Sequence, residues 1–234
     1  MSVDLSIIGN HSMRFKEKEI ADKSYLLELL NSLRLENSEF LKEMCIEWNS
    51  LYKYEKRKMS KKEKQRLENY LNIKGWKIDE YKDDDYCYDS LHYYLEGPYG
   101  LGLELNRYYF ELSIWVGRYY HWFTRKEKED ILWREKWRLI IYKITNILGG
   151  KYVMYFPDNM SDLSDYWPCN YTFPKEMAEY FHREINDLNQ VIQLISENYD
   201  KPLTLKEADR MYETIDKDPF VIDYFEDLDK TLRI

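Results

Sequence analysis

The stretch LGLELNRYYFELSIWV, residues 101–116, decides the fold class. It holds two strand-like runs joined at Asn106-Arg107, and a tight turn there predicts an antiparallel hairpin. In the second run, apolar residues (Phe110, Leu112, Ile114, Val116) alternate with the set Glu111, Ser113 and Trp115. Because side chains alternate across a strand, we expect the first set in the core and the second on the opposite face.

Helical patterns flank this hairpin on the N-terminal side. Apolar residues recur every three or four positions in residues 23–35 and 37–56, which predicts two amphipathic helices. Ser60 and Glu63 then have capping-box spacing, which predicts the start of a third helix.

The C-terminal side carries a still stronger helical pattern in residues 128–150. Its buried stripe is expected to include Trp137, and Gly149 is placed to end the helix. From Pro174 onward we expect only helix, with a second capping-box spacing at Thr204 and Glu207.

These patterns together predict an α+β fold. We expect an antiparallel sheet of about four to six strands with several packed helices, followed by a helical C-terminal segment. The expected organisation is an α+β core domain over residues 1–170 and a C-terminal helical segment over residues 171–234 packed on it.

Charge and cysteine content restrict the function classes. The net charge is −8, which does not suit sequence-independent binding of nucleic acid, so nucleic acid is not an expected partner. Residues 55–66, EKRKMSKKEKQR, are a local exception with seven Lys/Arg against two Glu. That run either touches nucleic acid or an acidic partner, or is a solvated connection between helices, and we favour the connection.

Three widely spaced cysteines, Cys45, Cys87 and Cys169, fit a reducing compartment. The sequence has no secretory signal pattern and no apolar run of about 18 residues, so we expect a cytosolic protein without a membrane segment.

The tripeptide Gly9-Asn10-His11 raises the question of a metal site, since binuclear phosphoesterases use such a tripeptide for metal ligands. A two-metal centre also needs further histidine and aspartate ligands at fixed spacing. This chain has four histidines and neither a D-x-H nor an H-x-H motif. We therefore interpret the tripeptide as a polar turn after a strand, and expect no metal and no cofactor.

Aromatic residues mark the surface that we predict to be functional. By alternation, Trp115, Tyr119 and His121 share one strand face, and Arg118 is adjacent. Tyr, Trp and Arg supply much of the binding energy at protein interfaces. The alternative is that helices cover this face as a second core layer.

Two classes of function remain after this reading. The first is a cytosolic, non-catalytic protein that binds another protein, as an interaction protein or an inhibitor or immunity-type protein does. The alternative is a hydrolase-like enzyme without a recognisable local motif, which would use Glu104, Glu111, His121 and Asp158 brought together by folding. Nothing in the sequence indicates the oligomeric state.

Overall fold

The computed structural model describes residues 5–16, 19–20, 22–50, 59–79, 93–105, 109–114, 128–157, 189, 193, 202–211 and 221–228. Its strands are β1 (Leu5–Gly9), β2 (Phe15–Lys16), β3 (Glu19–Ile20), β4 (Lys77–Asp79), β5 (Tyr93–Glu96), β6 (Gly102–Leu105), β7 (Phe110–Ser113), β8 (Val153–Pro157), β9 (Leu203–Thr204) and β10 (Val221–Asp223). Its α-helices are α1 (Lys23–Ser32), α2 (Glu39–Ser50), α3 (Lys61–Asn72), α5 (Lys128–Ile147) and α8 (Leu205–Met211). Two short 3₁₀ turns are η1 (Leu35–Asn37) and η3 (Pro98–Gly100).

A mixed sheet organises these elements. Within the described residues it has eight strands in the order β4-β5-β6-β7-β1-β8-β10-β9, and a separate hairpin is formed by β2 and β3. Every neighbouring pair of the large sheet is antiparallel except β10 and β9, which are parallel. The predicted antiparallel pairing is confirmed, since β6 and β7 pair from Gly102↔Ser113 to Leu105↔Phe110, while the predicted turn at Asn106-Arg107 lies outside the described residues.

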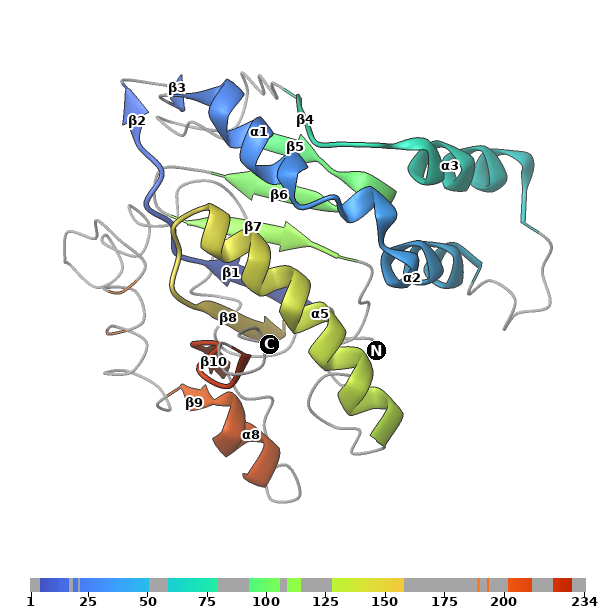
Figure 1. Cartoon of the computed structure of the whole chain (residues 1–234). Coiled ribbons are helices and arrows are strands. Elements are labelled where there is room, and N and C mark those ends of the chain that lie inside the picture. The colour runs from blue at the N-terminus through green and yellow to red at the C-terminus, as the bar shows by residue number, and fades with distance from the viewer. Residues whose placement is uncertain are drawn as a thin grey trace.

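One row of side chains crosses all eight strands on the core face of the sheet. The paired residues are Ile78, Leu95, Leu103, Leu112, Ile7, Tyr155, Val221 and Leu203. These side chains belong to or pack against one hydrophobic cluster with residues of α1, α2 and α5. Figure 1 shows α1 and α5 lying over the same face of the sheet, with α2 beyond the ends of the strands.

The neighbouring row points to the opposite face and has a different character. It runs through Tyr94, Glu104, Glu111, Ile8, Met154, Ile222 and Thr204. Ile8, Met154 and Ile222 are buried, so this part of the sheet is covered on both faces. Glu104 and Glu111 are half-buried and Ser113 is exposed, so the second face opens towards solvent along β6 and β7.

The helices begin and end where local signals place them. Ser60 and Glu63 form the predicted capping box of α3, and Thr204 and Glu207 form the corresponding pair at α8. After α5, Gly149 has a positive φ of 71°, as the predicted left-handed helix end requires.

Two predictions about the fold are wrong in detail. The sheet has eight strands rather than four to six, because two further strands come from the C-terminal part. That part is not all helical, since β10 pairs with β8 and with β9. The α+β class is confirmed, and the division of the chain at about residue 170 stays a prediction.

Candidate functional site

The predicted site residues fall into two groups. Trp115, Arg118, Tyr119, His121 and Asp158 lie outside the described residues. Glu104 and Glu111 are described, on β6 and β7. The structure brings these two together, although they are seven positions apart in sequence.

Glu104 and Glu111 are direct cross-strand partners on the second face of the sheet. In such a pair the Cβ atoms are about 4.5–5.5 Å apart, and two like charges there destabilise the sheet unless another interaction compensates. Tyr94 is the partner of Glu104 on the other side, and Ile8 is the partner of Glu111. The arrangement is therefore two carboxylates between a phenol and a buried aliphatic side chain.

Paired carboxylates of this kind have a defined chemical capacity. Two carboxyl groups a few ångströms apart can act as general acid and base, or as acid and nucleophile, on a substrate between them. They can also supply oxygen ligands to a hard cation. Among the described residues, however, no group of three or more His, Cys, Asp or Glu side chains is arranged to hold a metal ion.

A second candidate surface lies where α2 packs against α5. We call it the α2–α5 seam and define it by Phe40 and Met44 on α2 with Leu132, Trp133 and Lys136 on α5. The Trp133 Nε1–H donates to the Met44 sulfur at 2.7 Å, and the Lys136 ammonium lies 5.3 Å from the centroid of the Phe40 ring. Phe40, Met44 and Trp133 are half-buried, so part of each remains accessible.

The seam continues inward into the core and outward to solvent. On the inside, Phe40 meets Trp137 edge to face, with ring centroids 5.2 Å apart, and Trp137 is fully buried. On the outside, the Leu132 side chain is 55% exposed. An exposed leucine therefore precedes a partly accessible tryptophan on α5, and that tryptophan contacts a partly accessible methionine on α2.

A buried ionic cluster joins α5 to the C-terminal strands. Arg138 is 1% exposed, and its Nε and Nη2 donate to the two carboxylate oxygens of Asp223 at 2.7 and 2.9 Å. Its Nη2 also donates to Asp227 at 2.9 Å, and its Nη1 donates to Glu135 at 2.5 Å. Such forked pairing matches the guanidinium to its carboxylates in geometry as well as in charge.

Further hydrogen bonds complete this cluster. Asp223 is 3% exposed and also accepts from the Tyr155 hydroxyl at 3.1 Å and from the backbone N–H of Phe225 at 2.9 Å. One turn earlier on α5, Arg134 donates to both oxygens of Asp209 on α8, at 2.7 and 2.9 Å. Together these pairs attach α8 and β10 to α5.

The cluster shifts the protonation of its members. Burial, followed by the charge of Asp223, raises the pKa of Tyr155 well above its ordinary value, so Tyr155 stays a neutral donor. The hydrogen bond from Arg138 lowers the pKa of Asp227, so Asp227 stays ionised. Each charged side chain of the cluster is hydrogen-bonded to another member, so we interpret the cluster as stabilising the fold.

Sequence reasoning missed this cluster for a simple reason. Apart from Glu135 on the same helix, the carboxylate partners are distant in sequence: Asp209 is 75 residues from Arg134, and Asp223 is 85 residues from Arg138. The sequence offered one signal. Arg138 follows Trp137, which lies in the apolar stripe of the predicted helix, and an arginine buried there needs an anionic partner.

The Gly9-Asn10-His11 tripeptide has a structural role as the turn after β1. The Asn10 side-chain oxygen accepts from the backbone N–H groups of Lys151 and Tyr152, at 2.8 and 3.2 Å. The His11 Nδ1 accepts from the backbone N–H of Met13 at 3.1 Å. A side chain at position 9 would collide with the Phe110 ring, which explains the glycine.

Comparison with known proteins identifies no relative: no family model, no curated protein and no solved structure matches this chain. Within the described part of the chain, no helix is long and apolar enough to cross a membrane. The function therefore has to be inferred from the residues themselves.

Proposed function

We propose that this is a non-catalytic cytosolic protein that binds another protein, in the manner of an interaction protein or an inhibitor or immunity-type protein. The observation that supports the proposal is the α2–α5 seam, where Leu132 is exposed next in sequence to the half-buried Trp133, whose indole N–H contacts Met44. Tryptophan and methionine are enriched in the buried centres of protein interfaces, and a few such residues supply most of the binding energy.

The residues of the predicted aromatic face belong to the same proposal. Trp115 follows Glu111 and Ser113 by alternation, and Ser113 is exposed. Trp115, Tyr119 and His121, with Arg118 beside them, are a second proposed contact surface for a partner protein. Alternation assigns them to the sheet face opposite the helices, so this surface is separate from the α2–α5 seam.

The test begins with affinity capture of partners from native cell extract and continues with calorimetry on each purified partner. Leu132→Asp should weaken binding at least tenfold, since it places a charge in the apolar centre of the interface. Ile46→Asp is the matched control, because Ile46 is exposed on α2 but lies about 200° around the helix from Met44.

Tyr119→Ala tests this second surface and should weaken the binding of a partner that uses it by about 1 kcal/mol or more while leaving the melting temperature nearly unchanged. If a partner binds Leu132→Asp as tightly as it binds the wild type, the α2–α5 seam is not part of the interface. Finding no protein that binds the purified chain directly would refute the proposal as a whole.

A second candidate function is favoured by the cross-strand pairing of Glu104 and Glu111. In this case the protein is a hydrolase-like enzyme, and His121 and Asp158 complete a site around the two carboxylates. Screening the full chain against hydrolase substrates tests it. An activity that Glu104→Gln and Glu111→Gln both abolish, without a change in melting temperature, supports the enzyme, and no activity above the blank eliminates it.

A further inference from the structure

α3 and the segment that follows it carry an exposed cationic face. We call this the basic face and define it by Lys61, Lys62, Arg66, Lys74 and Lys77, since Lys64 lies on the other flank of the helix. All five residues are exposed, and within the part of the chain that the structure describes none of them makes an ion pair or a side-chain hydrogen bond. The five cations are therefore available to a ligand.

The fold fixes this face in position. α3 turns Leu67, Tyr70 and Leu71 inward, where they pack against the hydrophobic core, so its polar residues are left outside. α3 packs against α2 and η3 and lies at the margin of the molecule, beyond β4 (Figure 1). Nothing among the described residues covers its outer side.

The segment after α3 is anchored as firmly. Trp76 is buried, and its backbone N–H donates to the Asn31 side-chain oxygen at 2.8 Å. At Gly75 an added Cβ would lie 2.6 Å from that same oxygen, so only glycine allows this close approach. Lys74 and Lys77 flank this anchor and are thereby held beside the end of α3.

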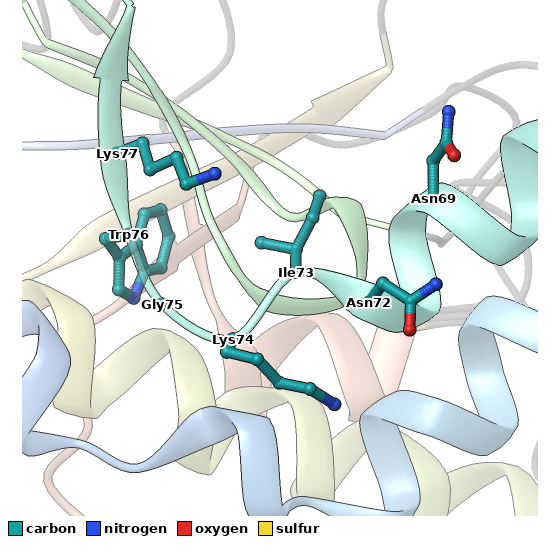
Figure 2. Close-up of a pocket in the computed structure, with 7 residues that line it drawn as sticks. All are labelled: Asn69, Asn72, Ile73, Lys74, Gly75, Trp76 and Lys77. Atoms are coloured by element: carbon teal, nitrogen blue, oxygen red, sulfur yellow. The ribbon is translucent and has the colours of Figure 1, made fainter.

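A pocket of about 510 Å³ lies where α3 meets β4. Asn69 and Asn72 line it from α3, and Lys74 and Lys77 line it from the following segment. Figure 2 shows Lys77 reaching from β4 towards the end of the helix. The pocket extends the basic face with two amides and two ammonium groups, all of which donate hydrogen bonds.

The charge of this region opposes that of the protein. Residues 60–77 contain six Lys/Arg and two Asp/Glu, while the whole chain has a net charge of −8. One of the two acids, Glu63, accepts from the backbone N–H of Ser60 in the capping box. Net charge averages over faces, so an acidic chain can still carry a local site for anions.

We infer that the basic face binds the phosphate backbone of a nucleic acid. Lysine and arginine neutralise phosphates, and asparagine and glutamine side chains bond to phosphates and base edges. Every exposed residue between 60 and 77 is polar. A face without an apolar centre suits a phosphate polymer better than a folded protein, whose interfaces bury apolar and aromatic anchors.

The dimensions agree with a short contact. Twelve helical residues span about 18 Å, which matches about five nucleotides at 3.4 Å per nucleotide of one strand. We therefore expect three to five phosphate contacts. This surface is separate from the α2–α5 seam, so either proposal can fail without the other.

The experiment is fluorescence anisotropy with the full chain and labelled 20-nucleotide single-stranded and 20-base-pair duplex oligonucleotides, at KCl concentrations from 50 to 200 mM. We expect binding at low salt that weakens with a log–log slope of about −2 to −4.5, as three to five phosphate contacts require. Lys62→Glu combined with Arg66→Glu should weaken binding at least tenfold. Lys143→Glu, a reversal of an exposed cation on α5, is the matched control and should leave binding unchanged.

A second double variant, Lys74→Glu with Lys77→Glu, lies outside α3 and should weaken binding as well, which removes any dependence on the stability of that helix. Lack of oligonucleotide binding at 50 mM KCl would overturn the inference, as would binding unaffected by both double variants. Equal affinity for poly-glutamate of similar length would also overturn it and would assign the face to an acidic protein partner.

Discussion

Replacing Arg138 by methionine should destabilise the protein severely. The guanidinium is buried and joins β10 to α5 through Asp223. Arg138→Met retains much of the apolar stem but removes the positive charge. The Asp223 carboxylate, which is only 3% exposed, then loses its cation. Tyr155 and the Phe225 backbone remain as neutral donors and compensate only in part. Breaking a buried ion pair from one side costs about 3–5 kcal/mol, and we expect that magnitude here.

The opposite change should cost less. Asp223→Asn removes the negative charge but leaves Arg138 with Asp227 and Glu135 as anionic partners. We expect a loss of about 1–3 kcal/mol, the cost of an imperfectly satisfied buried group. In the double variant neither buried charge remains, so its loss should fall short of the sum of the single losses by about 1–3 kcal/mol.

Urea denaturation followed by circular dichroism measures all three variants, with Lys143→Met as an exposed control on the same helix. The control should lie within about 0.5 kcal/mol of wild type. If Arg138→Met keeps the wild-type midpoint and slope, or if the double variant equals the sum of the singles, the ion pair does not act as the structure indicates.

Three further outcomes follow from other groups. Trp137→Ala should cost about 3–5 kcal/mol because Trp137 is fully buried. Trp137→Phe should cost less, since it removes an indole N–H that has no partner among the described residues; both are read from denaturation midpoints. Burial raises the pKa of Cys45 to about 11, so a thiol reagent at pH 8 should modify it only after unfolding. Arg138 lowers the pKa of Asp227 in the folded state, so this contribution to stability is complete above about pH 4, the carboxyl pKa of the unfolded chain. It should be lost as pH falls through the folded value, and urea titrations from pH 2 to 7 should show that loss weakened in Arg138→Met.

Local signals predicted the elements that depend on local interactions. The capping boxes at Ser60 and Thr204 need only residues three positions apart, and both are formed. The alternation from Phe110 to Ser113 gave the correct core face of β7. The stripe of α5 likewise placed Trp137 in the core.

Short strands that depend on distant partners were not predictable in this way. β9 has two residues and β10 has three, which is too few for a period to be recognised. β10 exists because β8, about 70 residues earlier in the chain, offers it an edge. The cross-strand pairing of Glu104 with Glu111 could not be predicted either, because it depends on the register of β6 against β7.

The positive charges of this acidic chain fall into two kinds, and pairing separates them. Arg134 and Arg138 are arginines in the core, each held by carboxylates that come from distant parts of the chain. Their forked geometry suits fixed, desolvated pairs, and their removal should destabilise the protein. The cations of the basic face are mostly lysines, which are strongly hydrated and carry flexible stems. Within the described residues these exposed lysines make no ion pair, although the chain as a whole has carboxylates in excess. A bound external anion would supply the electrostatic contacts that the described residues do not.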